Sequence, residues 1–262
     1  VKSIFRFYRD TPRVEVVTRL VNQTRDHRLR VCFNLPFVAE GTITSTHFGC
    51  VRRPAEAERV PSPEELRESV STYPELPSGI QAQKRFIRVE EPDGSDALTV
   101  FNIGLPEVEL VGHQRVAVTL VRSVGWLSRS DFTERPMHAG PAKETPGAQD
   151  LGTEYEFHYG FIVHSSSEPL HFSADESEAV AGGQMAVTAY MGTFPEEIGL
   201  PFMRLSNAAV RISSLRMRGQ SVLLTLYNLS DSPESVEIEL SRTRASLDEV
   251  RFDGTVIQSH DA

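Results

Sequence analysis

The sequence TLVRSVGWLSRSDFTERPMHAGPAKETPGAQDLG, residues 119–152, begins as a β-strand and then loses the strand pattern. It contains the only tryptophan, Trp126, followed by a stretch rich in proline and glycine. A long loop inside a compact domain is usually functional, and binding residues concentrate on ordered loops that a rigid scaffold carries. Because apolar anchors are spaced through this segment, we predict an ordered loop over residues 122–152 on a β scaffold.

Strand patterns flank this loop. Apolar and polar residues alternate in residues 14–20, 29–35, 115–121 and 154–164, as expected for half-buried strands. Residues 42–52 predict one further strand, and we expect Cys32 to face the core. Residues 61–70, PSPEELRESV, carry the signature of a capped helix start. The chain is therefore predicted to be all-β, with a short helical excursion.

The strand spacing divides the chain into two domains. Residues 1–199 form a large antiparallel β domain that carries the long loop, and residues 200–262 form a small C-terminal β-sandwich module. In the second segment, short strands and turns recur at the spacing of a small antiparallel sandwich.

Composition excludes several classes of protein. The formal net charge is −9, so we expect no nucleic-acid partner, because such binding needs clustered lysine and arginine. No apolar run approaches the ~18 residues of a membrane helix, and we expect no membrane partner. Two cysteines, Cys32 and Cys50, are too few for a disulfide scaffold. We expect both thiols to be reduced and the protein to be cytoplasmic.

No catalytic or metal-binding motif is present in the sequence. It lacks the common hydrolase, nucleotide-binding and zinc-protease signatures. His158 and His164 share a strand face, but six residues along a strand separate them by roughly 20 Å, too far for one metal ion. We therefore assign no catalytic residue and no metal ligand to this chain.

The loop does carry residues suited to binding a sugar. A sugar site needs a flat apolar face for the pyranose ring and bidentate groups for adjacent hydroxyls. The candidate substrate-binding residues are Arg122, Trp126, Arg129, Asp131 and Arg135. The alternative, which stays open, is that the arginines and the aspartate form a structural network that pins the loop.

Four segments in order resemble glycoside hydrolase family 38, the zinc-dependent α-mannosidases and mannosylglycerate hydrolases. They are VVTRLVNQTRDHRLRVCF (16–33), FNIGLPEVEL (101–110), LVRSVGWLSRSDFTERPMHAGPAKETPGAQ (120–149) and EYEFHYGFIVH (154–164). The resemblance is to the family's C-terminal β region. It implies a large β supersandwich similar to that of galactose mutarotases, followed by a smaller β module.

The resemblance also implies a function for the whole protein. The family is retaining, and its catalytic aspartate and its ligands for zinc, or another divalent metal, lie in an upstream domain that nothing in this chain matches. The implied partners are that upstream catalytic domain of the same protein and a mannose-containing carbohydrate. This chain alone is expected to be inactive and without a cofactor of its own. Residues 122–135 would reach the rim of the sugar site.

Two alternatives to this interpretation remain. One is a stand-alone carbohydrate-binding or mutarotase-like module, for which His158 with Glu156 or Glu154 is the only local suggestion of an acid–base pair. The other is a structural β module that mediates subunit contacts. The sequence leaves a homo-oligomer open.

Overall fold

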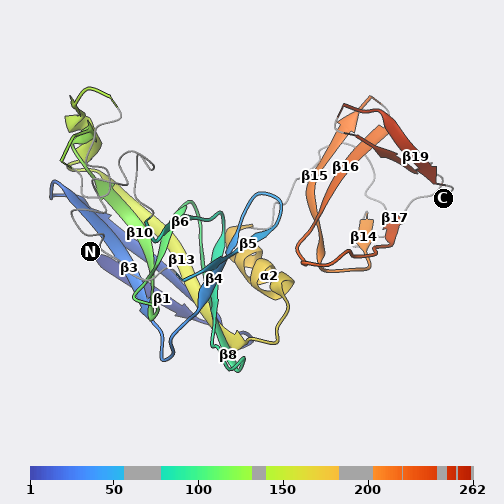
Figure 1. The fold of residues 1–262 in the computed structure, drawn as a ribbon, viewed down its shortest axis with the longest axis horizontal. Helices are drawn as coiled ribbons and strands as arrows, with labels where there is room; N and C mark the ends of the chain where they lie inside the picture. The colour runs from blue at the N-terminus through green and yellow to red at the C-terminus, as the bar shows by residue number, and fades with distance from the viewer. Residues whose placement is uncertain are drawn as a thin grey trace, which may run out of the picture. The chain divides into compact units, whose positions relative to one another are not determined.

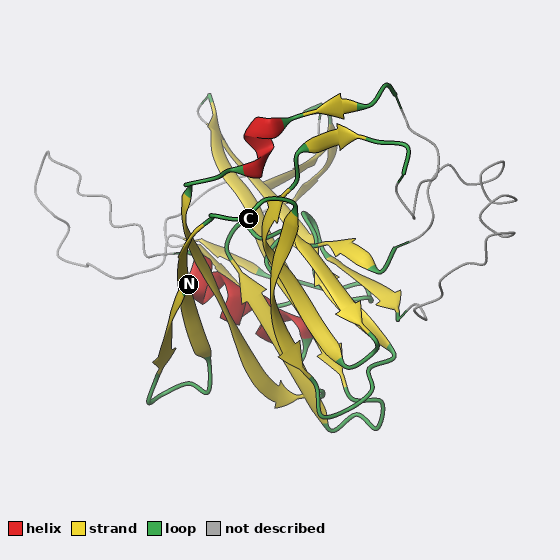
Figure 2. Cartoon of the chain, turned by 90° about the vertical axis from the view of Figure 1, so that its left-hand side faces the viewer, coloured by secondary structure: helices red, strands yellow, loops and turns green. Residues whose placement is uncertain are grey.

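The predicted strands are present in a computed structural model of the chain, which describes residues 1–55, 78–131, 140–182, 203–219, 221–240, 247–251 and 253–260. The chain divides into two compact units, residues 1–185 and 186–262. Strands predominate in both units (Figures 1 and 2), and the all-β prediction is confirmed. The predicted domain boundary between residues 199 and 200 and the predicted helix at 61–70 lie outside the described residues.

The first unit is built on a seven-stranded antiparallel sheet. Its inner strand β13 (Glu154–Ser165) is the longest strand described and pairs with β2 on one side and β8 on the other. The strand order is β1 (Lys2–Phe7), β2 (Val14–Val21), β13, β8 (Asp96–Asn102), β7 (Phe86–Glu90), β4 (Gly41–Ser45) and β5 (Cys50–Pro54).

A four-stranded antiparallel sheet faces this large sheet. Its order is β3 (His27–Asn34), β10 (Arg115–Ser123), β9 (Glu107–Val111) and β6 (Ile80–Ala82). The alternating pattern explains the packing, because every second residue of a strand points to the same face. Val116 and Val118 of β10 are fully buried against Val100 of β8 and its neighbours, in one apolar core between the two sheets.

Helix α2 (Leu170–Ala181) covers the other face of β7 and β8. It packs small side chains onto the sheet: Ser173 is buried and lies 2.8 Å, Oγ to Oγ1, from Thr99 of β8. The side chain of Arg88 in β7, also buried, donates to the carbonyls of Ser166 and Glu168 and so ties the segment before the helix to the sheet. The sequence analysis did not predict α2, whose N-cap residue is Pro169 and makes no side-chain capping bond.

The second unit consists of three antiparallel strand pairs among its described residues. They are β14 (Met203–Leu205) with β17 (Ile238–Leu240), β15 (Val210–Arg218) with β16 (Ser221–Asn228), and β18 (Leu247–Val250) with β19 (Val256–His260). Within the described part of the whole chain, no helix is long and apolar enough to span a membrane.

Two local predictions were wrong. Residues 42–52 were expected to form one strand, but they form the hairpin β4–β5, in which the chain turns at Gly49 with φ of 156°. Cys32 is exposed, because Val31 and Phe33 occupy the inward positions of β3 and the alternation turns Cys32 outward. Neither Cys32 nor Cys50 is part of a disulfide in the structure.

Candidate functional site

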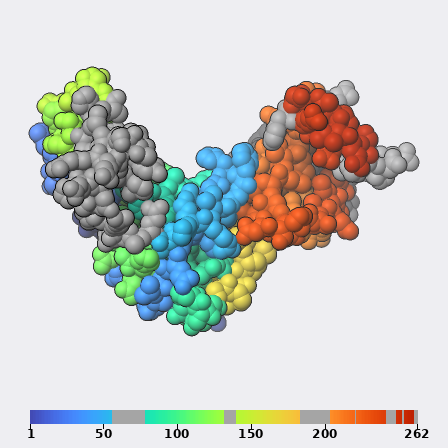
Figure 3. Space-filling view, in the orientation of Figure 1, coloured from blue at the N-terminus to red at the C-terminus, as the bar shows by residue number. Residues whose placement is uncertain are grey.

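The loop that leaves β10 projects beyond the two sheets and is ordered at its base. Its described residues form a short hairpin of β11 (Trp126–Ser128) and β12 (Lys143–Glu144), followed by the single 3-10 turn η1 (Pro146–Gln149). Trp126 lies opposite Glu144 in the pairing, and the Thr145 amide donates to the Gly125 carbonyl at 2.7 Å. In the space-filling view this loop is the yellow-green projection at the upper left (Figure 3).

A buried polar cluster fixes the two ends of the loop to each other. Ser123, at the end of β10, is fully buried, and its hydroxyl donates to the Gln149 carbonyl at 2.8 Å. The amide of Asn22, which follows β2, donates to the same carbonyl at 2.7 Å. Buried hydrogen bonds of this kind are costly to lose, because each unpaired group keeps its full desolvation penalty. The cluster therefore holds the start and the end of the loop beside β2.

The Gln149 side chain extends this cluster to the turn before β3. Its Nε2 donates to Asp26 Oδ1 at 2.6 Å, and its Oε1 accepts from the Asp26 amide at 2.9 Å. A Cβ on Gly125 would lie 2.5 Å from Gln149 Nε2. A side chain at residue 125 would therefore require the Gln149 side chain to move from its bonds with Asp26.

Three of the five predicted substrate-binding residues come together at the edge of the loop. Arg129 forms a two-point contact with Asp131, in which Nε donates to Oδ1 at 2.8 Å and Nη2 to Oδ2. The Arg129 guanidinium carbon also lies 5.4 Å from the centre of the Trp126 ring, in cation–π geometry. We call Trp126, Arg129 and Asp131 the loop cluster.

The electrostatics of the loop cluster follow from this contact. The hydrogen bond from Arg129 lowers the pKa of Asp131, and the same bond raises the pKa of Arg129, with Asp26 contributing more weakly in the same direction. Both side chains are well exposed, at 42% for Arg129 and 59% for Asp131. The pair is therefore fully charged at neutral pH and accessible to a ligand.

The loop cluster has the groups that a pyranose ring requires. The half-buried indole offers an apolar face, while a carboxylate and a guanidinium held in one plane offer an acceptor and a donor for neighbouring hydroxyls. The same contacts also fit the structural alternative, because they constrain the backbone from residue 126 to 131. The geometry thus combines a rigid support with exposed polar groups.

The other two predicted residues are not placed in the loop cluster. Arg122 lies on β10, exposed and opposite Arg28 of β3, and within the described residues it has no hydrogen-bond or ion-pair partner. Arg135 lies outside the described residues. Sequence reasoning did not find Asn22, Ser123 or Gln149. No sequence signal links them, since Asn22 and Gln149 are brought together only by the antiparallel pairing of β2 with β13.

The histidines of β13 do not form a metal site. His158 Nε2 lies 2.8 Å from Glu156 Oε1, and this contact lowers the pKa of Glu156, as does Arg19, which also binds that carboxylate. His164 instead lies under α2, where burial lowers its pKa. In the described part of the chain no three His, Cys, Asp or Glu side chains gather as metal ligands would.

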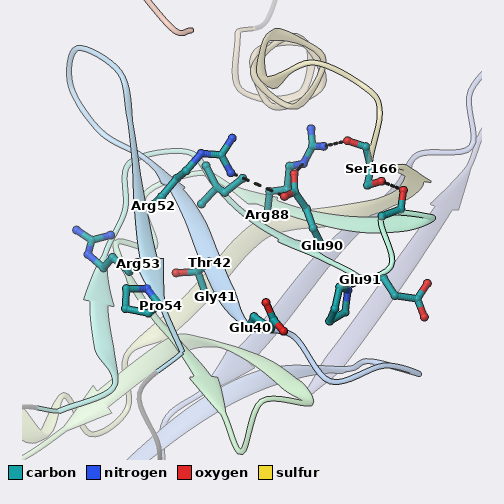
Figure 4. A pocket seen from close by; sticks show the side chains of 13 residues that line it. Glu40, Gly41, Thr42, Arg52, Arg53, Pro54, Arg88, Glu90, Glu91 and Ser166 are labelled. Atoms are coloured by element: carbon teal, nitrogen blue, oxygen red, sulfur yellow. Dashed lines mark hydrogen bonds and ion pairs between the residues drawn. The ribbon is translucent and has the colours of Figure 1, made fainter. Parts of the chain in front are cut away.

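Apart from the loop cluster, a hollow lies between the hairpin β4–β5 and the end of β7 (Figure 4). It has a volume of about 490 Å³ and is lined by three arginines and three glutamates, Arg52, Arg53, Arg88, Glu40, Glu90 and Glu91. Arg88 Nε lies 2.8 Å from Glu90 Oε1, as an ion pair without hydrogen-bond alignment, and Arg53 donates to Thr44. Since these arginines are engaged within the protein and no aromatic face lines the hollow, the loop cluster is the better candidate.

Comparison with solved structures identifies the fold. The chain is similar to a protein in glycosyl hydrolase family 38 from Enterococcus faecalis, with a TM-score of 0.70 and 23% identity over 94% of this chain and 26% of that one. It is also similar to an alpha-mannosidase from Enterococcus faecalis, with a TM-score of 0.69 and 23% identity over 91% of this chain and 24% of that one.

The comparisons also define how much is shared. No protein-family model matches the chain, and no curated protein matches its sequence. The chain spans about a quarter of the length of the two solved structures. The fold that the family resemblance implied is therefore confirmed, as one part of larger proteins.

Proposed function

We propose that this chain is the non-catalytic β portion of a retaining α-mannosidase-type glycoside hydrolase and that its loop cluster lines the sugar site of the whole protein. The similarity to a quarter of larger family 38 chains supports the first statement. The arrangement of Trp126, Arg129 and Asp131, which sets two exposed charged groups beside an indole ring, supports the second.

The chemistry is divided between this chain and the rest of the protein. A retaining glycosidase needs two carboxyl groups ~5 Å apart across the scissile bond. Asp131 is the single carboxylate of the loop cluster, and Arg129 already binds both of its oxygens. The described residues offer no ligand set for zinc, so no metal-dependent step is assigned to them. The role left to the loop cluster is to bind and orient sugar hydroxyls.

Arg129→Ala in the full-length protein tests this role. Loss of a hydrogen bond from a charged group costs about 1.5–3 kcal/mol, so kcat/KM for an aryl α-mannoside should fall by about tenfold to a hundredfold. Arg19→Ala is the matched control, because Arg19 also forms an exposed ion pair, but with Glu156 of β13 instead of a residue of the loop cluster. Steady-state kinetics of both variants make the comparison.

The outcomes separate binding from structural support. If Arg129 contacts sugar, Arg129→Ala lowers kcat/KM while hydrogen exchange in the loop base, residues 143–150, is unchanged. A variant with wild-type kcat/KM would remove the loop cluster from the sugar site. Faster exchange in residues 143–150 together with lower activity would favour the structural alternative.

A further inference from the structure

The two sheets of the first unit differ in width, and their contacts show where they overlap. Phe33 of β3 packs edge-to-face on Tyr159 and Phe161 of β13, with ring centres 6.4 and 5.5 Å apart. At the other end, Thr42 of β4 donates to Gln81 of β6 at 2.7 Å. The inward residues Val14 and Val16 of β2 are also buried in the core between the sheets. The small sheet thus covers the large one from β2 to β4, and β1, the edge strand beyond β2, lies outside this cover.

The inner face of β1 has the residues of a core but no cover. Phe5 pairs with Val16 and Phe7 with Val14, so both phenylalanines point to the face on which those valines enter the core. Yet Phe5 is 57% exposed and Phe7 is 76% exposed. Apolar side chains on the core face of a sheet are normally covered by the opposing sheet, and here that sheet ends too early.

The uncovered face lies beside a free backbone edge. Among the described strands, β3 pairs only with β10, so the other edge of β3 presents unpaired amides and carbonyls. Its inward residues, Leu29, Val31 and Phe33, are only half-buried. Figure 1 shows β1 and β3 at the same margin of the unit, close to the N-terminal label. A free edge next to exposed aromatic side chains is a site for one more strand.

We propose that polypeptide of the same protein outside residues 1–262 supplies a β-strand that pairs with the free edge of β3 and covers Phe5 and Phe7. This inference rests on the proposed function, since it requires this chain to be part of a larger protein. The two matched structures are about four times longer than the region they share with this chain, which provides ample polypeptide. The strand would alternate apolar residues, facing β1, with polar ones that face outward beside Arg28 and Arg30.

A second copy of this chain fits the margin poorly. Two copies that approached through their β3 edges would first meet at the overhanging strand β1. Each overhang is about 5 Å wide, because neighbouring strands lie ~4.8 Å apart. The two β3 edges would therefore stay about two strand widths apart, and neither would gain a backbone partner.

Hydrogen exchange of the full-length protein, followed by mass spectrometry of peptides covering residues 27–34, tests the proposal. In an edge strand the amides that point away from the sheet exchange rapidly, whereas in an inner strand all are protected. We expect the whole of β3 to exchange as slowly as β10. Rapid exchange of half of the β3 amides would overturn the proposal.

A pair of substitutions on β1 adds a specific readout. Phe7→Asp places a charge under the proposed strand and should speed exchange of the outward β3 amides by at least about tenfold. Ile4→Asp is the matched control, because Ile4 pairs with Val17 and points to the opposite face of the same strand. Equal effects of the two variants on β3 would contradict the assignment of the covered face.

Two further measurements identify which idea fails. Sedimentation of the protein before and after tenfold dilution tests whether the covering strand belongs to the same polypeptide. If dilution lowers the sedimenting mass and β3 loses its protection at the same time, a separate partner covers the edge and the proposal is overturned. Activity addresses the proposed function. An active α-mannosidase with an unprotected β3 edge would overturn the added strand alone. A protected edge in a protein without that activity would overturn the proposed function alone.

Discussion

Gly160 lies in the middle of β13, where two neighbours leave no room for a side chain. A Cβ at this position would lie 2.3 Å from the Val14 carbonyl oxygen and 2.5 Å from the Phe101 ring. Since the first of these atoms is backbone, the strand itself would have to move. The longest strand of the large sheet therefore depends on a glycine that the sequence pattern alone does not single out.

Gly160→Ala is expected to destabilise the first unit by about 1–3 kcal/mol, the usual cost of overpacking a core. Gly147→Ala is the control, because a Cβ there meets nothing within 4 Å. The free energy of opening, taken from hydrogen exchange of residues 154–165, measures the difference. Equal exchange in the two variants would show that β13 can shift to accept the methyl group.

Substitutions of two serines near the start of the loop should differ in the size of their effects. Ser123 Oγ binds Gln149 and Asn22, whereas Ser128 Oγ is buried without a hydrogen-bond partner in the described structure. Ser123→Ala should lower the free energy of opening of the loop base by about 1–2 kcal/mol. Ser128→Ala should change it by less than about 0.5 kcal/mol, because no bond is lost. Exchange of residues 143–150 reports both, and the opposite ranking would contradict the bonding described for the loop base.

At the scale of elements, helix α2 depends on a chain of neutral hydrogen bonds. His164 Nε2 lies 2.8 Å from Thr99 Oγ1, and Thr99 in turn contacts Ser173 of the helix. The imidazole ring of His164 also packs on Phe172. Burial is the largest cause of its lowered pKa. Arg88 lowers the pKa further, while the Ser165 carbonyl, Glu168 and Glu90 act in the opposite direction. The docking of α2 is therefore tuned to a neutral imidazole.

This arrangement predicts how stability changes with pH. The unfolded chain takes up a proton near pH 6.5, above the lowered pKa of His164 in the folded protein. The free energy of unfolding should therefore fall as the pH drops below about 6.5, until the folded pKa is passed. His164→Gln should reduce the difference in thermal unfolding midpoint between pH 7 and pH 5. His158→Gln, on the exposed part of the same strand, should change it less, and a reversed order would contradict the role of His164.

Elements with a strong alternating pattern could be predicted from the sequence. Strands β2, β3, β10 and β13 fall where apolar residues recur at every second position, because the core selects that period. Helix α2 could not be predicted in this way. It rests on Ser173, Ala174 and Ser177, small residues that fit close to the sheet but leave no apolar stripe in the sequence.

The candidate site was predictable only in part, for a related reason. Trp126, Arg129 and Asp131 are neighbours in sequence, so their chemistry could be recognised before their contacts were known. The cluster that supports them joins Asn22 to Ser123 and Gln149 across the fold. Such contacts follow from strand pairing, and a single sequence does not show which strands pair with each other.

At the scale of the whole molecule, the proposed function assigns a binding loop and a scaffold to this chain and the reaction centre to the rest of the protein. Asp131 is committed to Arg129, and the described residues hold no cluster of metal ligands. The comparisons place this fold in proteins about four times longer. We therefore expect residues 1–262, prepared alone with added zinc, to show no hydrolysis of an aryl α-mannoside, while the full-length protein hydrolyses it.

The measurement has three informative results because Trp126 is the only tryptophan in the chain. Turnover by residues 1–262 at a rate near that of the full-length protein would contradict the division of labour proposed here. Inactivity with unchanged Trp126 fluorescence in mannose would fit a loop that needs the rest of the site to bind sugar. Inactivity with mannose-dependent quenching would show that the loop cluster binds sugar by itself, since a ring stacked on the indole changes its surroundings directly. That last result would favour an independent carbohydrate-binding module. It would count against a sugar site that the loop cluster lines and another domain completes.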